Sequence, residues 1–259
     1  MCNNKNLILI PCCKRKTIIP FENDFAQPLE NMPVYRNNLL EIINTDEILS
    51  AEPENIDGIL NTDATLTRAL DMYQGIFYNT TRTELETFVN EGNNCIHILI
   101  VSAFYGLVQL QEGLKKYELQ MGDELTNINN PVCNRPDMFW VGKELSQVLR
   151  EYVTDNKIQR IWSLLPDSLN NNCKTPYHRV FKDLWEESRD NNQLDCFHVF
   201  CFSKRENGDL VSKGAGTGAY RAKWLKKILS NGQYLCDNIP PPDHYEFDDI
   251  DAVYEYKES

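Results

Sequence analysis

Four short apolar segments limit the folds that this chain can adopt. Residues 7–10 form the first of them, a continuous apolar run that ends at Pro11. The other three cover residues 95–101, 159–165 and 195–202. Runs of this length are typical of buried strands, and the stretches between them favour helices at residues 34–43, 65–73, 83–90, 137–154, 177–187 and 220–229. This alternation predicts an α/β fold: a single domain with a mostly parallel or mixed central sheet flanked by helices.

Charge divides the chain into two parts. The 259 residues carry a net charge of −12, but residues 237–259 alone hold eight acids and one base. We therefore predict an α/β domain over residues 1–236, followed by an acidic C-terminal tail over residues 237–259. Residues 204–227 hold seven bases and two acids, which indicates a basic face that could meet DNA, RNA or a nucleotide. A solvated tail and an ordinary basic helix face explain the same pattern.

Cations and hydroxyls follow two of the predicted strands. Lys14, Arg15 and Lys16 come directly after the first strand, and Ser102, Tyr105 and Gly106 come after the second. Ligands of open α/β sheets bind outside the carboxyl ends of the strands. We expect Lys14 to bind phosphate or act as a nucleophile, with Ser102 and Tyr105 as further candidate catalytic groups. Arg15 and Lys16 are candidate phosphate ligands, and Gly106 would allow a ligand to approach the backbone closely.

Two further glycine-containing segments are candidate contacts for nucleic acid or phosphate. Tyr73 and Gly75 belong to an aromatic cluster that could stack on a base, although core packing explains it equally well. The second segment is rich in glycine and precedes a basic helix, so backbone N–H groups at the helix start could hold a phosphate. Its candidate residues are Lys213, Gly216, Thr217, Gly218, Arg221 and Lys223.

Several classes of protein and site do not fit the sequence. It has no apolar stretch long enough to span a membrane and no segment typical of a signal peptide, so we expect a cytoplasmic protein. Nine cysteines then indicate reduced thiols. They form no C-x-x-C pair, and we predict neither a metal site nor a cofactor. The oligomeric state cannot be predicted from the sequence.

Three segments together resemble the YaaA family of peroxide-stress proteins. The first, LILIPCCK, is similar to the family's L-I-L-I-S-P-A-K, and residues 73–78 are similar to its aromatic and glycine segment. The longest, residues 98–125, resembles a family strand that continues to Y-R-L-E-M-G, which here reads Tyr117-Glu-Leu-Gln-Met-Gly122. Residues 138–140 resemble the family's F-W-G turn, and the second half of the chain matches loosely. Tyr117 is therefore added to the candidate binding residues.

The resemblance implies a cytoplasmic protein tied to peroxide stress, with DNA binding as attributed to members of the family. We therefore expect a DNA-binding protein that protects DNA or handles damaged or modified nucleic acid. The alternative is an enzyme of glycosylase or transferase type, acting on a nucleotide or modified nucleobase in a pocket with Lys14 and Tyr105. The pattern leaves open whether the protein is catalytic. Two departures from the family are Pro11-Cys12-Cys13 in place of Ser-Pro-Ala, and Glu118 and Gln120 in place of arginine and glutamate.

Overall fold

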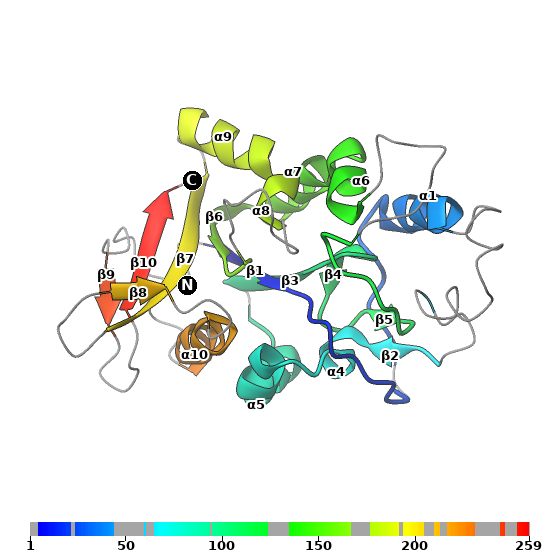
Figure 1. Ribbon diagram of the computed structural model, residues 1–259, viewed down its shortest axis with the longest axis horizontal. Helices are drawn as coiled ribbons and strands as arrows, with labels where there is room; N and C mark the ends of the chain where they lie inside the picture. Colours follow the sequence, from blue (N-terminus) through cyan, green and yellow to red (C-terminus); the bar gives the residue numbers. More distant parts are fainter. Residues whose placement is uncertain are drawn as a thin grey trace.

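The described residues fold as a central sheet with helices on both faces (Figure 1). The computed structural model describes residues 5–21, 24–43, 60, 65–93, 95–123, 135–166, 177–191, 194–204, 210–212, 217–230, 244–246 and 253–258. The α/β prediction, with a mixed central sheet flanked by helices, is confirmed.

The main sheet is built around four parallel strands. Within the described residues the strand order is β4-β3-β1-β6-β7-β10-β9, and β8 also pairs with β7. The parallel strands are β1 (Lys5–Pro11), β3 (Ile96–Ser102), β6 (Ile158–Ser163) and β7 (Asp195–Lys204). Antiparallel strands extend both sides: β4 (Gly106–Gln109), β8 (Leu210–Ser212), β9 (His244–Glu246) and β10 (Val253–Glu258). A second, small sheet pairs β2 (Thr67–Arg68) with β5 (Gly113–Leu114).

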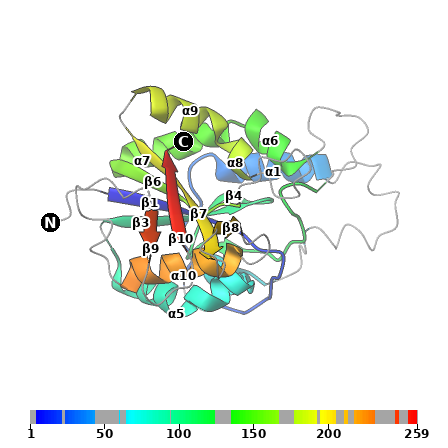
Figure 2. The same ribbon diagram turned by 60° about the vertical axis from the view of Figure 1, so that its left-hand side comes forward.

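Helices cover the two faces of the sheet, as Figures 1 and 2 show from two directions. One face carries α6 (Pro136–Gly142), α7 (Leu145–Asn156), α8 (Tyr177–Val180) and α9 (Lys182–Asn191), with α1 (Met32–Ile43) beside α6. The other face carries α4 (Ala69–Met72), α5 (Ile76–Glu91) and α10 (Thr217–Ser230). Because both faces are covered, all four apolar residues of the run at 7–10 are fully buried.

Two predicted helices differ from those in the structure. Residues 67–68 form β2 because they pair with β5, so tertiary pairing overrides the local helical pattern. The helix expected over residues 137–154 is two helices, α6 and α7. They are separated at Glu144, whose φ of 52° is left-handed and therefore interrupts the α-helix.

Residues of the predicted acidic tail also take part in the main sheet. Strand β10 pairs with β7, and β9 pairs with β10, both in antiparallel fashion. Figure 1 shows β9 and β10 beside β7 at the left-hand side of the molecule. The domain boundary at residue 236 stays a prediction, and the described part of the tail is sheet.

The order of the parallel strands places a topological switch point next to β1. The chain passes from β1 to β3 on one side, and then back to β6 on the other side of β1. Open α/β sheets bind ligands outside the carboxyl ends of their strands near such a switch point, so the carboxyl end of β1 is where a ligand is expected.

Helices α5 and α10 run parallel to each other, with their N-termini together. A Cβ atom built on Gly218 would lie 3.7 Å from Ile76 Cγ2, which places the two helix starts side by side. Two turns further along both helices, Lys226 Nζ lies 2.9 Å from Glu84 Oε1. This arrangement brings two helix N-termini, each with a partial positive charge, to the same end of the sheet.

Candidate functional site

The segment after β1 is fixed in place by backbone hydrogen bonds. Cys12 N donates to Val101 O at 3.0 Å, which prolongs the parallel ladder by one residue. Residues 15–17 then pair with residues 72–74 through two hydrogen bonds of 3.0 and 2.9 Å. Lys14 and Arg15 are exposed on this segment, whereas Lys16 turns inward and is only 8% exposed.

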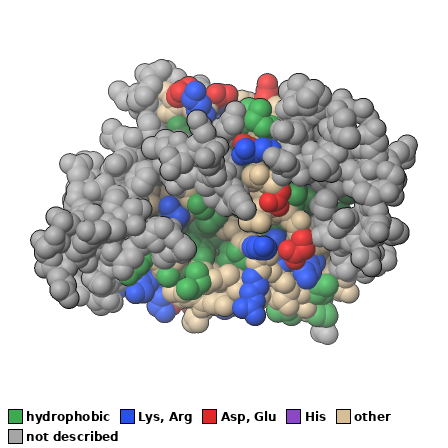
Figure 3. All heavy atoms as spheres, viewed as in Figure 1, with side chains coloured by type: hydrophobic (Ala, Val, Ile, Leu, Met, Phe, Trp, Pro, Cys, Tyr) green, Lys and Arg blue, Asp and Glu red, His purple; other side chains and the backbone are tan. Residues whose placement is uncertain are grey.

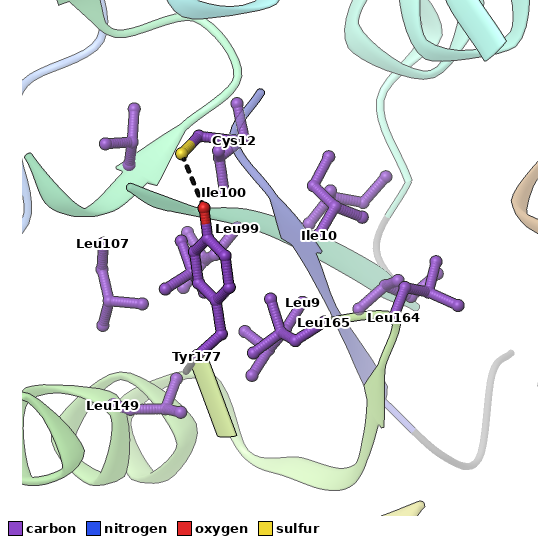
Figure 4. Close-up of a cluster of buried hydrophobic side chains, with 14 of the residues drawn as sticks. Leu9, Ile10, Cys12, Leu99, Ile100, Leu107, Leu149, Leu164, Leu165 and Tyr177 are labelled. Atoms are coloured by element: carbon purple, nitrogen blue, oxygen red, sulfur yellow. Dashed lines mark hydrogen bonds between the residues drawn. The ribbon is translucent and has the colours of Figure 1, made fainter. Parts of the chain in front are cut away.

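The two cysteines at the end of β1 bind groups on opposite faces of the sheet. Cys12 Sγ lies 3.0 Å from the hydroxyl of Tyr177, the first residue of α8. Figure 4 shows the Tyr177 ring among buried leucines, with its hydroxyl directed at Cys12. On the other face, Cys13 Sγ accepts a hydrogen bond of 3.2 Å from Gly75 N at the start of α5. A Cβ atom on Gly75 would lie 2.9 Å from Cys13 Cβ, so this contact requires glycine.

A chain of three buried hydroxyls lies beside this segment. Ser102 Oγ lies 2.8 Å from Tyr117 Oη, and Tyr117 Oη lies 3.0 Å from Tyr73 Oη. Ser102 Oγ also accepts the backbone N–H of Tyr105 at 3.0 Å. Lys16 Nζ lies over the Tyr117 ring, 4.1 Å from its centroid. Residues from four separate parts of the sequence therefore meet in one polar cluster: Lys16, Tyr73, Ser102 and Tyr117.

Burial keeps the tyrosines of this region protonated. It raises the pKa of Tyr73, Tyr117 and Tyr177 well above the ordinary value of 10, because a buried phenolate would lose its hydration. Negative charge on the nearby Cys12 would raise these pKa values further. Burial also raises the pKa of Cys13, and the N–H of Gly75 offsets part of that increase. The cluster therefore presents neutral hydroxyl donors beside the side chain of Lys16.

Tyr105 and Gly106 are held by packing. Tyr105 Oη donates to Lys115 O at 2.9 Å and accepts from Lys115 N at 3.0 Å, so both backbone polar groups of Lys115 are bound. Gly106 has a φ of 66°, and a Cβ atom there would lie 3.0 Å from the Trp140 ring. The Trp140 ring, and not a ligand, therefore occupies the space that the missing side chain of Gly106 leaves.

Tyr73, expected to stack on a base, uses its ring in the core. It is fully buried, and its ring stacks on that of Tyr78 with centroids 5.1 Å apart. The hydroxyl of Tyr78 donates to Pro11 O at 2.8 Å, at the end of β1. The two aromatic rings thus support the segment that carries the exposed cations.

The glycine-rich segment is described only in part. Lys213 and Gly216 lie outside the described residues, and α10 begins at Thr217. Gly218 lies against the start of α5, and Lys223 is exposed, with Nζ 5.1 Å from the centroid of the Tyr220 ring. Arg221 is 6% exposed, so it faces the protein interior.

The structure brings most of the expected residues to one end of the sheet. Lys14, Arg15, Lys16, Tyr73 and Gly75 lie together with Ser102 and Tyr117. Cys12 and Tyr177 meet at the same strand end, although the sequence did not indicate them as site residues. Their contact joins residues 165 positions apart, so no local pattern indicates it.

The surface above this end of the sheet is hollowed. Figure 3 shows a depression near the end of β1, with hydrophobic side chains at its floor and Lys and Arg side chains at its edge. Among the described residues no group of three or more His, Cys, Asp and Glu side chains gathers as metal ligands would. In the same part of the chain, no helix is long and apolar enough to cross a membrane.

The fold and this cluster define an α/β protein with an open sheet and a candidate binding site at the carboxyl ends of β1 and β3. The chain belongs to the family of peroxide stress protein YaaA, because that family's model matches residues 8–238. The match extends through the second half of the chain, where the resemblance in sequence is loose. No curated protein matches the sequence.

Proposed function

We propose that this member of a peroxide-stress family binds DNA at the carboxyl edge of its sheet, and so protects DNA or handles its damaged forms. The supporting observation is that Lys14 and Arg15 are both exposed directly after β1, next to the paired starts of α5 and α10. Exposed cations and helix N-termini are the groups that bind backbone phosphates. Lys223, in the second turn of α10, adds a third exposed cation.

This proposal implies a strong dependence on salt. A bound protein releases counterions from DNA, and the slope of log K against log salt is about −0.9 for each phosphate contact. Three contacts therefore predict an affinity loss of about 40-fold between roughly 50 and 200 mM salt. The net charge of −12 opposes binding, and we propose that the acidic residues after position 236 compete for the same cations.

The test is fluorescence anisotropy with a labelled duplex and a labelled single strand across a salt series. The double substitution Lys14→Ala/Arg15→Ala should leave one contact, so the affinity loss over the same salt range should shrink to about 3- to 4-fold. The control is Lys182→Ala, which removes a 66%-exposed lysine on the other face of the sheet and should leave both affinity and slope unchanged. Equal slopes for the double variant and the control would refute the proposal.

A second candidate is an enzyme that acts on a nucleotide or a modified nucleobase. The observation that favours it is the buried chain of Ser102, Tyr117 and Tyr73 next to a lysine, because enzymes place such groups where a base or sugar is held. Oligonucleotides with oxidised or alkylated bases should then be converted, and Ser102→Ala should slow the conversion. If no substrate in such a panel changes, this second candidate fails while the DNA-binding proposal stands.

A further inference from the structure

Lys16 is a buried cation without a carboxylate. Lys16 is only 8% exposed, yet it takes part in none of the ion pairs among the described residues. Its Nζ lies 3.4 Å from Lys14 O and above the Tyr117 ring. An ammonium group carries three hydrogen-bond donors, so one long bond and one ring face leave it short of partners.

Three buried arginines of the described chain are matched by acids. Arg36 pairs with Glu112, Arg68 with Asp71 and Glu86, and Arg160 with Asp195. The side chains of these three arginines are 9 to 11% exposed, so they are buried about as deeply as Lys16. Removing a charge from water without a partner is costly, and proteins retain such groups mainly at functional sites.

The fold holds Lys16 in this position. Hydrogen bonds from Thr17 N to Met72 O and from Gln74 N to Arg15 O fix the backbone on both sides of it. These hydrogen bonds join backbone atoms only, so an uncharged side chain at position 16 would leave them intact. The backbone pairing of residues 15–17 therefore does not explain why a lysine is present.

The hydroxyl chain supplies a further donor at the same place. Ser102, Tyr117 and Tyr73 carry three O–H groups, each of which can donate a hydrogen bond, and two O–O contacts of 2.8 and 3.0 Å join them. Ser102 Oγ already accepts from Tyr105 N, and burial keeps both phenols protonated. A cation beside hydroxyl groups that can donate hydrogen bonds is a set of groups that suits an oxyanion.

We propose that Lys16, with the hydroxyls of Tyr117, Tyr73 and Ser102, binds the phosphate group of a small phosphate monoester. Phosphate is the class of oxyanion that lysine binds as a point charge, and the site lies at the strand end where the start of α5 is anchored to Cys13. A duplex phosphate cannot reach a lysine this deeply buried. The site is therefore distinct from the exposed Lys14 and Arg15, and it does not depend on DNA binding.

The experiment is calorimetric titration of the full chain with inorganic phosphate, at constant ionic strength in chloride. The intact protein should bind one phosphate saturably, and Lys16→Met should weaken this binding at least tenfold. The matched control is Lys143→Met, which also removes a lysine over an aromatic ring, that of Phe139 at 5.8 Å. This control should bind phosphate as the intact protein does.

Thermal unfolding of the same variants separates a binding role from a packing role. Without phosphate, Lys16→Met should unfold at the same or a higher temperature than the intact protein, because it removes an unmatched buried charge. Tyr117→Phe keeps the ring beneath Lys16 and should weaken phosphate binding severalfold. This second variant tests the proposal even if Lys16→Met fails to fold.

Phosphate binding by Lys16→Met equal to that of the intact protein would overturn the proposal. So would no saturable phosphate binding by the intact protein, or binding of acetate in its place.

Discussion

Replacing Gly106 by alanine tests the packing around the strand end after β3. Gly106 has a φ of 66°, and an alanine Cβ would lie 3.0 Å from two atoms of the Trp140 ring and 3.1 Å from Met32 Sδ. The ring cannot move aside easily, because Trp140 is fully buried and its Nε1 donates to Ala103 O at 2.8 Å. We therefore expect Gly106→Ala to destabilise the protein strongly.

The magnitude has two parts. A left-handed conformation costs an alanine about 1–2 kcal/mol, since its Cβ approaches the following carbonyl oxygen. Insertion of a methyl group into a well-packed core costs about 1–3 kcal/mol more. Gly106→Ala should therefore lower the free energy of unfolding by about 2–5 kcal/mol.

Alanine substitutions at two other glycines separate the conformational cost from the packing cost. Gly92 has a φ of 69° with nothing within 4 Å of its built Cβ, so Gly92→Ala should show the conformational cost alone, about 1–3 kcal/mol. Gly142 has neither a positive φ nor a close neighbour, so Gly142→Ala should be neutral or stabilise by up to about 1 kcal/mol. Urea unfolding followed by tryptophan fluorescence measures all three. A smaller loss for Gly106→Ala than for Gly92→Ala would refute the reasoning.

Three further predictions concern buried polar groups. Tyr117→Phe breaks both bonds of the hydroxyl chain and should lower the free energy of unfolding by about 1–3 kcal/mol, more than Tyr73→Phe, which breaks only one. Arg36→Met leaves Glu112 buried without its partner and should cost about 3–5 kcal/mol in the same urea assay. Burial lowers the pKa of His97 below its ordinary 6.5, so its contribution to stability should be complete above pH 6.5 and be lost as the pH falls through the lowered pKa. In unfolding curves measured against pH, His97→Gln should lack that component, and an unchanged pH profile would contradict the assignment.

The main elements could be predicted from local patterns. The apolar run at residues 7–10 is β1, and the run at 95–101 is β3 shifted by one residue, because strands buried on both faces must be apolar throughout. The break between α6 and α7 could not be predicted from the helical period alone, since Gly142 precedes it but the left-handed residue is Glu144. The strand at Thr67 depends on a partner almost fifty residues away.

The location of the candidate site could be predicted from the sequence, but the role of each residue in it could be predicted less well. The rule that ligands bind at the carboxyl ends of strands selects residues 14–16 and 102–106, and these do flank the polar cluster. The pairing of residues 15–17 with residues 72–74 decides which of the three cations turns inward. No local sequence pattern indicates that Lys16, and not Lys14, is the buried one. Tyr177 reaches Cys12 from α8, far along the chain, and this contact likewise follows only from the tertiary fold.

The most direct test of the account is to map binding on the protein by amide chemical shifts. A labelled sample titrated with a short DNA duplex should show its largest shifts at Lys14, Arg15, the start of α5 and the start of α10. Titration with inorganic phosphate should instead move Lys16 and its neighbours Tyr117 and Ser102. Shifts concentrated at the opposite edge of the sheet, around Lys5, His97 and Lys157, would contradict the placement of function at the carboxyl ends of β1 and β3.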